Sequence, residues 1–350
     1  MLLNTIDEAV SNLFPGYFAL VMATGIVSIA SDLVGFRWIA MALLYVNAVA
    51  YVVLWVLTLL RLARYLPRML ADLTNHTRGA GFFTIVAGTC VLGSQFIHVA
   101  GDLRVGAVLW WIGLGLWVVI MYGFFSAITV IEEKPSLDRG INGAWLISIV
   151  ATQAASILAT QLAAPYRGEH PVLLFFALSM FLVGCMLYIF IITLILYRFS
   201  FFRLTMAALT PPYWINMGAV AITTLAGATL ILHADKWSVL LDLTPFLKGF
   251  TLLFWAMATW WIPLLFILGA WRHLHERYPV TYDPQYWGMV FPLGMYAACT
   301  FRLSEALGVP FLMEIPRYFI YVALAAWLLT FLGMMKRLLL PASPSVSTGA

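Results

Sequence analysis

Neutral hydrogen-bonding side chains recur inside long stretches of this 350-residue chain that hold no Asp, Glu, Lys or Arg. They are the hydroxyls and amides of Thr24, Ser28, Thr89, Ser94, Gln95, Thr152, Gln153, Asn216 and Thr224. Such groups can solvate an anion by donating hydrogen bonds. Cation pores usually carry carboxylate rings or ordered carbonyl filters, and this pattern shows neither. The residue types therefore favour weak, fast passage of anions over tight binding.

A large ring followed by a proline stands in the ninth of these stretches, at Phe291 and Pro292. Pro292 removes one backbone hydrogen bond and kinks the helix that contains it. A ring beside a kink can be pushed into the axis of a pore, where it blocks ions by steric exclusion and dewetting. We therefore predict a gate at Phe291. The alternative is a phenylalanine packed between helices, in a chain that has 24 of them.

The elements that would position these residues are ten uncharged hydrophobic segments. The chain is 63% hydrophobic and 10% charged, with a mean hydropathy of +0.95. Each segment can cross a hydrocarbon core of about 30 Å as a helix of about 20 residues. The segments span about 14–31, 38–60, 81–101, 105–131, 142–166, 171–197, 211–234, 249–271, 284–301 and 318–335. We predict an all-α integral membrane domain over residues 1–340 and a disordered tail over 341–350.

A small or polar residue, usually followed by two aromatic residues, opens every second segment. The copies are Gly16-Tyr17-Phe18, Gly81-Phe82-Phe83, Gly143-Ala144-Trp145, Pro212-Tyr213-Trp214 and Gln285-Tyr286-Trp287. A period of about 67 residues fits one helix out, one helix back and two loops. The ten transmembrane helices are therefore expected to form five helical hairpins in a quasi-five-fold arrangement. The odd-numbered helices would line a central pore.

Aligning the odd-numbered helices on the last residue of each triplet defines three levels of the expected pore lining. Four residues further on stand Met22, Ala87, Ile149, Gly218 and Phe291. Seven and ten residues further on stand Gly25, Cys90, Thr152, Ala221 and Gly294, then Ser28, Gly93, Ala155, Thr224 and Ala297. These last two levels share one helical face and hold only small residues. Small residues commonly serve close helix packing, and here we predict that they also converge on the pore.

Charge and metal-ligand patterns limit the other classes of function. Lys and Arg are more frequent in the loops on the side of both termini, which predicts cytosolic termini in a plasma or inner membrane. The basic residues are scattered, so the pI near 9.0 gives no evidence for nucleic acid. The cysteines look like packing residues, and His273 and His275 cannot share a helix face. We expect no metal, no cofactor and no enzyme activity.

The run from Trp287 to Gly294 resembles the tellurite-resistance/dicarboxylate transporter family, as do Phe14-Pro15-Gly16-Tyr17-Phe18, Met22-Ala23-Thr24-Gly25 and Pro211-Pro212-Tyr213-Trp214. That family includes bacterial TehA, the plant slow-type anion channels, and fungal malate and sulfite permeases. The resemblance implies a homotrimer in which the odd helices of each subunit line its own pore and a phenylalanine in the ninth helix, here Phe291, occludes it. It implies small anions as substrates, such as malate, sulfite, chloride, nitrate or tellurite. Bulky Met22 and Ile149 at the level of Phe291 depart from the pattern and leave open a shared constriction.

Channel and carrier remain alternative mechanisms on this plan. Coupled carriers generally keep ionisable groups near mid-membrane and often show inverted repeats and broken helices. Here the repeats run in the same direction and no charge lies mid-helix, while His98, His170 and His233 lie near outer ends or loops. The residues therefore favour a channel. The resemblance includes permeases, so the alternative is a proton-coupled carrier or exporter of malate or sulfite.

Overall fold

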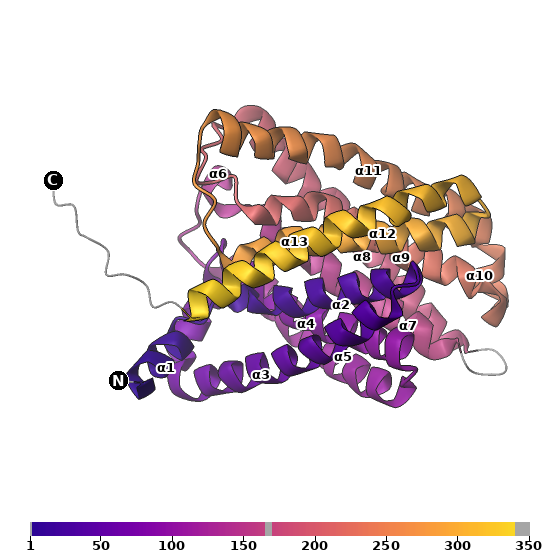
Figure 1. The fold of residues 1–350 in the computed structure, drawn as a ribbon, viewed down its shortest axis with the longest axis horizontal. Coiled ribbons are helices and arrows are strands. Elements are labelled where there is room, and N and C mark those ends of the chain that lie inside the picture. The colour runs from indigo at the N-terminus through magenta and orange to yellow at the C-terminus, as the bar shows by residue number, and fades with distance from the viewer. Residues whose placement is uncertain (1, 165–169, 340–350) are drawn as a thin grey trace.

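The computed structural model describes residues 2–164 and 170–339, and within them the chain is helical and forms no strand (Figure 1). The predicted all-α class is therefore confirmed for this part of the chain. The last residues of the segment predicted at 142–166 and the tail at 341–350 lie outside the described residues.

Among the described residues, nine helices are long and apolar enough to cross a membrane. They are Pro15–Leu33, Arg37–Thr74, Gly79–Ala100, Leu103–Val130, Gly143–Ala163, Pro171–Phe201, Pro211–Leu232, Thr244–His275 and Pro310–Leu339. The predicted segment 284–301 falls in a further helix, α12 (Trp287–Leu307), which is not among the nine. Its mean hydropathy is lowered by Arg302 and Glu305 near its end.

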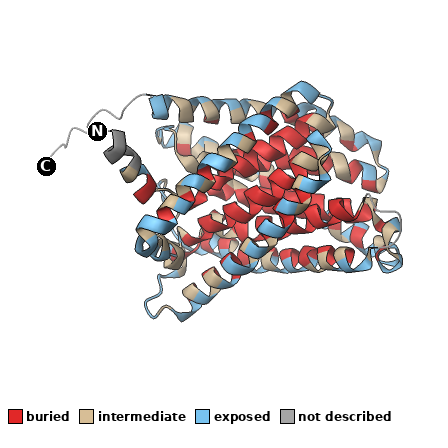
Figure 2. Ribbon diagram, turned by 90° about the horizontal axis from the view of Figure 1, so that it is seen from below, coloured by how far each residue is buried: buried red, intermediate tan, exposed pale blue. Residues whose placement is uncertain are grey.

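The helices divide into an inner and an outer set. The inner set is α2 (Ala19–Leu33), α4 (Phe83–Gln95), α7 (Ile147–Ala163), α9 (Ile215–Leu232) and α12. Each inner helix contacts the next one in this order, and α12 contacts α2, so the contacts close into a ring. Figure 2 shows the buried residues gathered along these central helices.

The outer set surrounds this ring. It comprises α3 (Arg37–Thr74), α5 (Leu103–Val130), α8 (Pro171–Phe201), α11 (Thr244–Ala270) and α13 (Glu314–Leu339). These helices contact α2, α4, α7, α9 and α12 respectively. Their outward faces carry exposed large apolar side chains, as suits helices that meet lipid. The short α1 (Leu2–Ser11) contacts α3 and lies at the same end of the molecule as the last turn of α13 (Figure 1).

The aromatic triplets form short 3₁₀ turns before the inner helices. The turns are η1 (Pro15–Phe18), η2 (Gly79–Phe82), η4 (Gly143–Leu146), η5 (Pro211–Trp214) and η8 (Pro284–Tyr286). Proline suits the first position of such a turn because its φ is already fixed and no N–H partner is needed there. Glycine lets the turns touch one another, since a Cβ on Gly81 would lie 2.9 Å from the backbone nitrogen of Gly16.

Three tryptophans of the outer set donate hydrogen bonds to threonines of the inner set. The indole nitrogens of Trp117, Trp255 and Trp327 lie 2.9, 3.0 and 2.9 Å from the hydroxyl oxygens of Thr152, Thr300 and Thr24. A buried indole N–H needs a partner, and these bonds supply it within the membrane-facing layer. They also fix the rotation of α7, α12 and α2 relative to the outer helices.

Candidate functional site

A cavity of about 600 Å³ lies where the five inner helices begin. We call it the amino-end cavity. One residue from the first turn of each inner helix lines it: Ala19, Thr84, Ile147, Ile215 and Gly288. Helix N-termini carry partial positive charge and present backbone N–H groups, so several of them around one cavity favour anions.

The charged side chains of the amino-end cavity are mainly basic. Arg78, Arg139, Arg198 and Arg203 line it together with one acidic residue, Asp138. A hydrogen bond from Ser136 lowers the pKa of the Asp138 carboxyl, so Asp138 is ionised at neutral pH. The arginines still outweigh it, and their charge adds to that of the helix ends. The cavity is therefore a positive vestibule.

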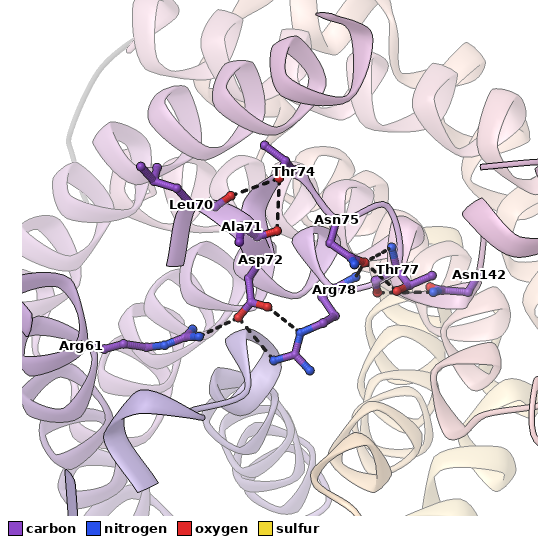
Figure 3. Close-up of polar contacts among 9 residues, drawn as sticks. All are labelled: Arg61, Leu70, Ala71, Asp72, Thr74, Asn75, Thr77, Arg78 and Asn142. Atoms are coloured by element: carbon purple, nitrogen blue, oxygen red, sulfur yellow. Dashed lines mark hydrogen bonds and ion pairs between the residues drawn. The ribbon is translucent and has the colours of Figure 1, made fainter. Parts of the chain in front are cut away.

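Arg78 is held at this vestibule by Asp72, near the end of α3 (Figure 3). The Asp72 carboxylate accepts from Arg78 Nε at 2.6 Å and from Arg61 Nη2 at 2.7 Å. The Asn75 side-chain oxygen accepts from the backbone N–H groups of Thr77 and Arg78 at 2.9 and 3.1 Å, which fixes the turn between them. One carboxylate thus serves two guanidinium groups, and the cluster keeps a net positive charge.

Arg198 reaches the same cavity from α8. It is buried, and it donates to the carbonyl oxygen of Ile141 and to the hydroxyl of Tyr213. Arg272, at the corresponding end of α11, donates to the carbonyl of Leu209. These arginines tie the connecting segments to the outer helices, so Arg198 combines a structural role with a charge in the cavity wall.

A second cavity, of about 490 Å³, lies toward the other ends of the inner helices. We call it the carboxyl-end cavity. Its apolar wall includes Ile26, Val91, Ala154, Ile222 and Met295, one from each inner helix. Its polar lining consists of Ser94, His98, Gln161, Thr229, His233, Arg302 and Glu305.

The two cavities lie along the same face of each inner helix. On every inner helix the residue in the carboxyl-end cavity stands seven positions after the residue in the amino-end cavity, and seven residues are close to two helical turns. The residues three positions after the first cavity share this face: Met22, Ala87, Val150, Gly218 and Phe291. All five are buried. A Cβ added to Gly218 would lie 3.5 Å from Phe291 Cδ1, so the Phe291 ring stands against α9.

Residues 12–335 match the model of the SLAC1 family, described as a voltage-dependent anion channel. The chain belongs to this family. The match confirms the resemblance to the tellurite-resistance/dicarboxylate transporters, supports anion transport in general and points away from an enzyme.

The chain is also similar to individual membrane proteins and transporters. An uncharacterized membrane protein of Mycobacterium tuberculosis is 39% identical over 152 residues, which are 43% of this chain and 77% of the relative. An uncharacterized transporter of Methanocaldococcus jannaschii is 26% identical over 305 residues, 83% of each chain. The sulfite efflux pump SSU1 of Trichophyton rubrum is 24% identical over 343 residues, covering 92% of this chain and 90% of the pump.

The predicted gate level and the structure of this SLAC1-family chain differ by one residue on α7. Val150 stands three residues after the cavity residue Ile147, the spacing found on the other inner helices, whereas the predicted residue at this level is Ile149. The turn before α7 ends at Leu146, one position after the tryptophan used for the alignment. On the other four inner helices the same spacing selects the residues that the sequence alignment places at this level: Met22, Ala87, Gly218 and Phe291. Their role as a gate stays a prediction.

Most residues of the predicted levels seven and ten residues after the triplets lie at contacts between helices. A Cβ on Gly25, Gly93 or Gly294 would stand within 3 Å of Val91, Leu158 or Val27, and one on Gly113 would stand 2.5 Å from Cys90 Sγ. Three more residues of these levels hydrogen-bond to outer helices: Ser28 donates to Ala40 O, Thr152 accepts from Trp117, and the Ala155 carbonyl accepts from Trp110. Thr224 donates to Val220 O within α9, and Ala221 and Ala297 are buried. Among the described residues that line the two cavities, none belongs to these levels. Their contacts are those of close helix packing.

The cavity arginines are functional candidates that sequence reasoning missed. Arg78 and Arg139 stand three and four residues before the glycines that open the second and third triplets. That position, directly before the turn of an inner helix, is the signal that could have indicated them. In the sequence alone, these arginines count only toward the loop charge that predicts membrane orientation.

Proposed function

We propose that this protein carries small anions across a membrane, through a path inside the ring of inner helices of each subunit, and that Phe291 gates this path. The observation that carries the proposal is the arrangement along one helical face. A positive cavity, a fully buried layer and a second cavity follow one another on all five inner helices.

The proposal includes ten membrane crossings arranged as five hairpins. The helix α12 would be the additional crossing, because it contacts α2, α9 and α13 over its length. Arg302 and Glu305 line a cavity there, so they need not face lipid. The basic amino-end cavity would face the cytosol of a cell with both termini on that side of its plasma or inner membrane. We retain the homotrimer implied by the family resemblance, with lipid around it.

Closure at Phe291 is supported by its surroundings. The ring is fully buried, it lies on the helical face shared by both cavities, and it stands against Gly218. Met22 and Val150 lie on the same face of their helices, so they would narrow the path together with Phe291. A narrow apolar layer excludes ions by size and by dewetting. Pro292 frees one backbone acceptor beside the ring, which makes a local kink possible.

The substrates we propose are small inorganic anions or C4-dicarboxylates. The vestibule would concentrate anions through its arginines, while the apolar layer offers no tight binding site, and this combination suits a channel. Sulfite is a natural first substrate to test, given the sulfite efflux pump among the relatives. The alternative is a proton-coupled carrier or exporter of malate or sulfite. It is favoured by one observation, the ionisable His98 and His233 in the carboxyl-end cavity.

The experiment is current recording in planar bilayers under anion gradients. Wild type, Phe291→Ala and Phe181→Ala would be compared, because Phe181 is as buried as Phe291 but lies on α8 away from both cavities. We expect a large anion-selective current in Phe291→Ala and little in the other two. Absence of current in all three, together with uptake of malate or sulfite driven by a pH gradient in liposomes, would overturn the channel and leave the carrier.

A further inference from the structure

We infer that the amino-end cavity is a binding site for a small phosphate monoester, and that the bound monoester closes the anion path from the side of the vestibule. The effect on the path rests on the proposed function, whereas the binding site itself does not. The cavity holds about 600 Å³, a size typical of sites for small organic ligands. A free phosphate ion would fill only part of this space, whereas a phosphate group with a short polar tail suits it.

The buried arginine of the cavity wall points to an anionic ligand. Arg198 on α8 is 8% exposed, and its Nη1 donates to the carbonyl oxygen of Ile141 and to the hydroxyl of Tyr213, which are both neutral. No carboxylate of the described residues pairs with it. Its Nε and Nη2 have no partner there either, yet they are not sealed from solvent as Nε of Arg61 and of Arg272 are. These N–H groups are therefore open to the cavity that Arg198 lines.

The open charge of Arg198 can be matched by a phosphate group. A buried guanidinium without a counter-charge is costly, because no ion pair offsets its loss of hydration. Phosphate oxygens can accept paired N–H bonds from the planar guanidinium, which makes phosphate a good counter-charge. Arg302 in the carboxyl-end cavity lacks this property, because Glu305 already neutralises it at 2.8 Å. Of the two cavities, the amino-end cavity is therefore the one with an unmatched buried cation.

The net charge of the lining favours a ligand with two negative charges over one with a single charge. Four arginines and one aspartate line the cavity, which leaves a charge of +3. Arg78 shares the Asp72 carboxylate with Arg61, and this cluster keeps one positive charge (Figure 3). Arg139 and Arg203 make no ion pair among the described residues. A phosphate monoester carries nearly two charges at neutral pH, and the five helix N-termini around the cavity attract it further.

Neutral side chains of the same cavity suit the polar tail of a monoester. Thr210 and Gln285 line the cavity, and within the described part of the chain their hydrogen bonds involve the backbone only. A side-chain hydroxyl and a side-chain amide that are free in this way can bond to the hydroxyl groups of a ligand. Ile147 and Ile215 supply apolar wall beside them. The ligand class is therefore a small phosphate monoester with a hydroxylated tail.

A ligand of this class would stay in the vestibule. The layer beyond the cavity is buried on every inner helix, at Met22, Ala87, Val150, Gly218 and Phe291. A narrow apolar layer excludes ions by size and by dewetting, and the organic tail adds bulk that a small inorganic ion lacks. The bound monoester would therefore occupy the entrance that smaller anions share. Its charge would also cancel the attraction of the vestibule for them.

The first experiment measures binding of radiolabelled glycerol 3-phosphate to the purified protein in detergent at constant ionic strength. Glycerate is the matched competitor, because it keeps two hydroxyl groups and carries one negative charge in place of two. We expect glycerol 3-phosphate to bind about tenfold more tightly than glycerate, because its second charge acts on arginines without a counter-charge. Inorganic phosphate, which lacks the tail, should also bind more weakly. No transport is required, so a failure of the Phe291 gate leaves this test intact.

Two cavity variants and one control locate the site. Arg198→Gln should weaken binding of glycerol 3-phosphate about tenfold or more, the typical effect of losing a hydrogen bond to a charged group. Arg198 also holds two connecting segments, so Arg203→Gln supplies a second variant with an exposed side chain and should weaken binding about threefold. Arg104→Gln removes the same charge from an exposed arginine of α5 that is not among the described residues lining either cavity. It should leave the affinity unchanged.

Several results would overturn the binding site. Equal affinities for glycerol 3-phosphate and glycerate would show that the second charge is not recognised, and an equal affinity for inorganic phosphate would show that the tail is not. A loss in Arg104→Gln as large as in Arg203→Gln would trace binding to the charge of the whole protein. Unchanged affinity in both cavity variants would place the ligand elsewhere.

The effect on the path is tested in bilayers with the Phe291→Ala variant. Glycerol 3-phosphate added on the vestibule side should reduce the anion current, and Arg203→Gln in this background should raise the half-blocking concentration about threefold. Binding in detergent together with an unblocked current would reject the regulatory role. Binding in detergent without any current through Phe291→Ala would support the site and reject the proposed path instead.

Discussion

The contact between α9 and α12 at Gly218 can be tested with a single methyl group. A Cβ at Gly218 would lie 2.7 Å from Pro292 Cγ and 3.5 Å from Phe291 Cδ1. The first distance is too short for two carbon atoms, so Pro292 or its helix must move in Gly218→Ala. Such overpacking costs about 1–3 kcal/mol. Alanine favours the helix over glycine by about 1 kcal/mol. The net loss in the free energy of unfolding is therefore about 0–2 kcal/mol.

Gly123→Ala on α5 supplies the matched control, because a Cβ there meets no atom of the described residues within 4 Å. It should gain up to about 1 kcal/mol from helix propensity alone. The two variants should therefore differ by about 1–3 kcal/mol in the free energy of unfolding, measured by reversible denaturation in mixed detergent. The closer contact is Pro292, so the loss from Gly218→Ala should persist in a Phe291→Ala background. Equal stability of the two glycine variants, or a loss that vanishes without the Phe291 ring, would refute this packing.

Three further predictions concern the polar contacts. Asp72→Asn should lower the free energy of unfolding by about 3 kcal/mol, because it leaves the buried Arg61 guanidinium without its carboxylate; chemical denaturation measures this. Trp327→Phe should cost about 1 kcal/mol, the value of its 2.9 Å hydrogen bond to Thr24, measured by the same denaturation. Burial lowers the pKa of His76, so the unfolded chain binds its proton more readily; stability should fall as pH drops below about 6.5, and His76→Gln should weaken this dependence of the melting temperature on pH.

Each of the three predictions has a control measurement. Asp32→Asn breaks a pair whose arginine, Arg37, has a side chain that is 58% exposed, and it should cost less than about 1 kcal/mol. If Asp72→Asn lowers the free energy of unfolding no more than Asp32→Asn does, the role given to Arg61 is contradicted. Trp111→Phe changes an exposed indole on α5 and should leave stability nearly unchanged. Identical pH profiles for wild type and His76→Gln would show that His76 does not contribute.

The inner helices could be recognised from the sequence because their starts carry local chemistry. Proline, glycine and paired aromatic residues mark the turns that precede them, and those turns appear in the structure at Pro15–Phe18 and Pro211–Trp214. The rotation of each helix about its own axis could not be predicted in the same way. A helix such as α7 is buried on every side, so hydrophobicity does not distinguish the face toward the axis from the faces toward its neighbours.

The small residues predicted to line the pore are aligned in register, and most of them lie at contacts between helices in the structure. Gly25 and Gly294 stand where helices approach most closely, against Val91 and Val27. Bulky residues such as Ile26 and Met295 line a cavity instead. Close packing needs small side chains at contacts, whereas the diameter of a ring of five helices leaves space at its centre even beside large ones. The spacing of residues along the sequence does not determine the diameter of this ring.

The bonds from Trp117, Trp255 and Trp327 to the inner threonines bear on how quickly a path through this ring could open. Turning an inner helix about its axis would break such a bond in an apolar layer where water cannot replace it. Reorienting one aromatic side chain breaks none of them. Collective helix motions take microseconds to milliseconds, while side-chain rotations are generally faster. If the Phe291 ring is the moving part, single-molecule recordings should show brief, flickering openings in a scaffold that keeps its shape.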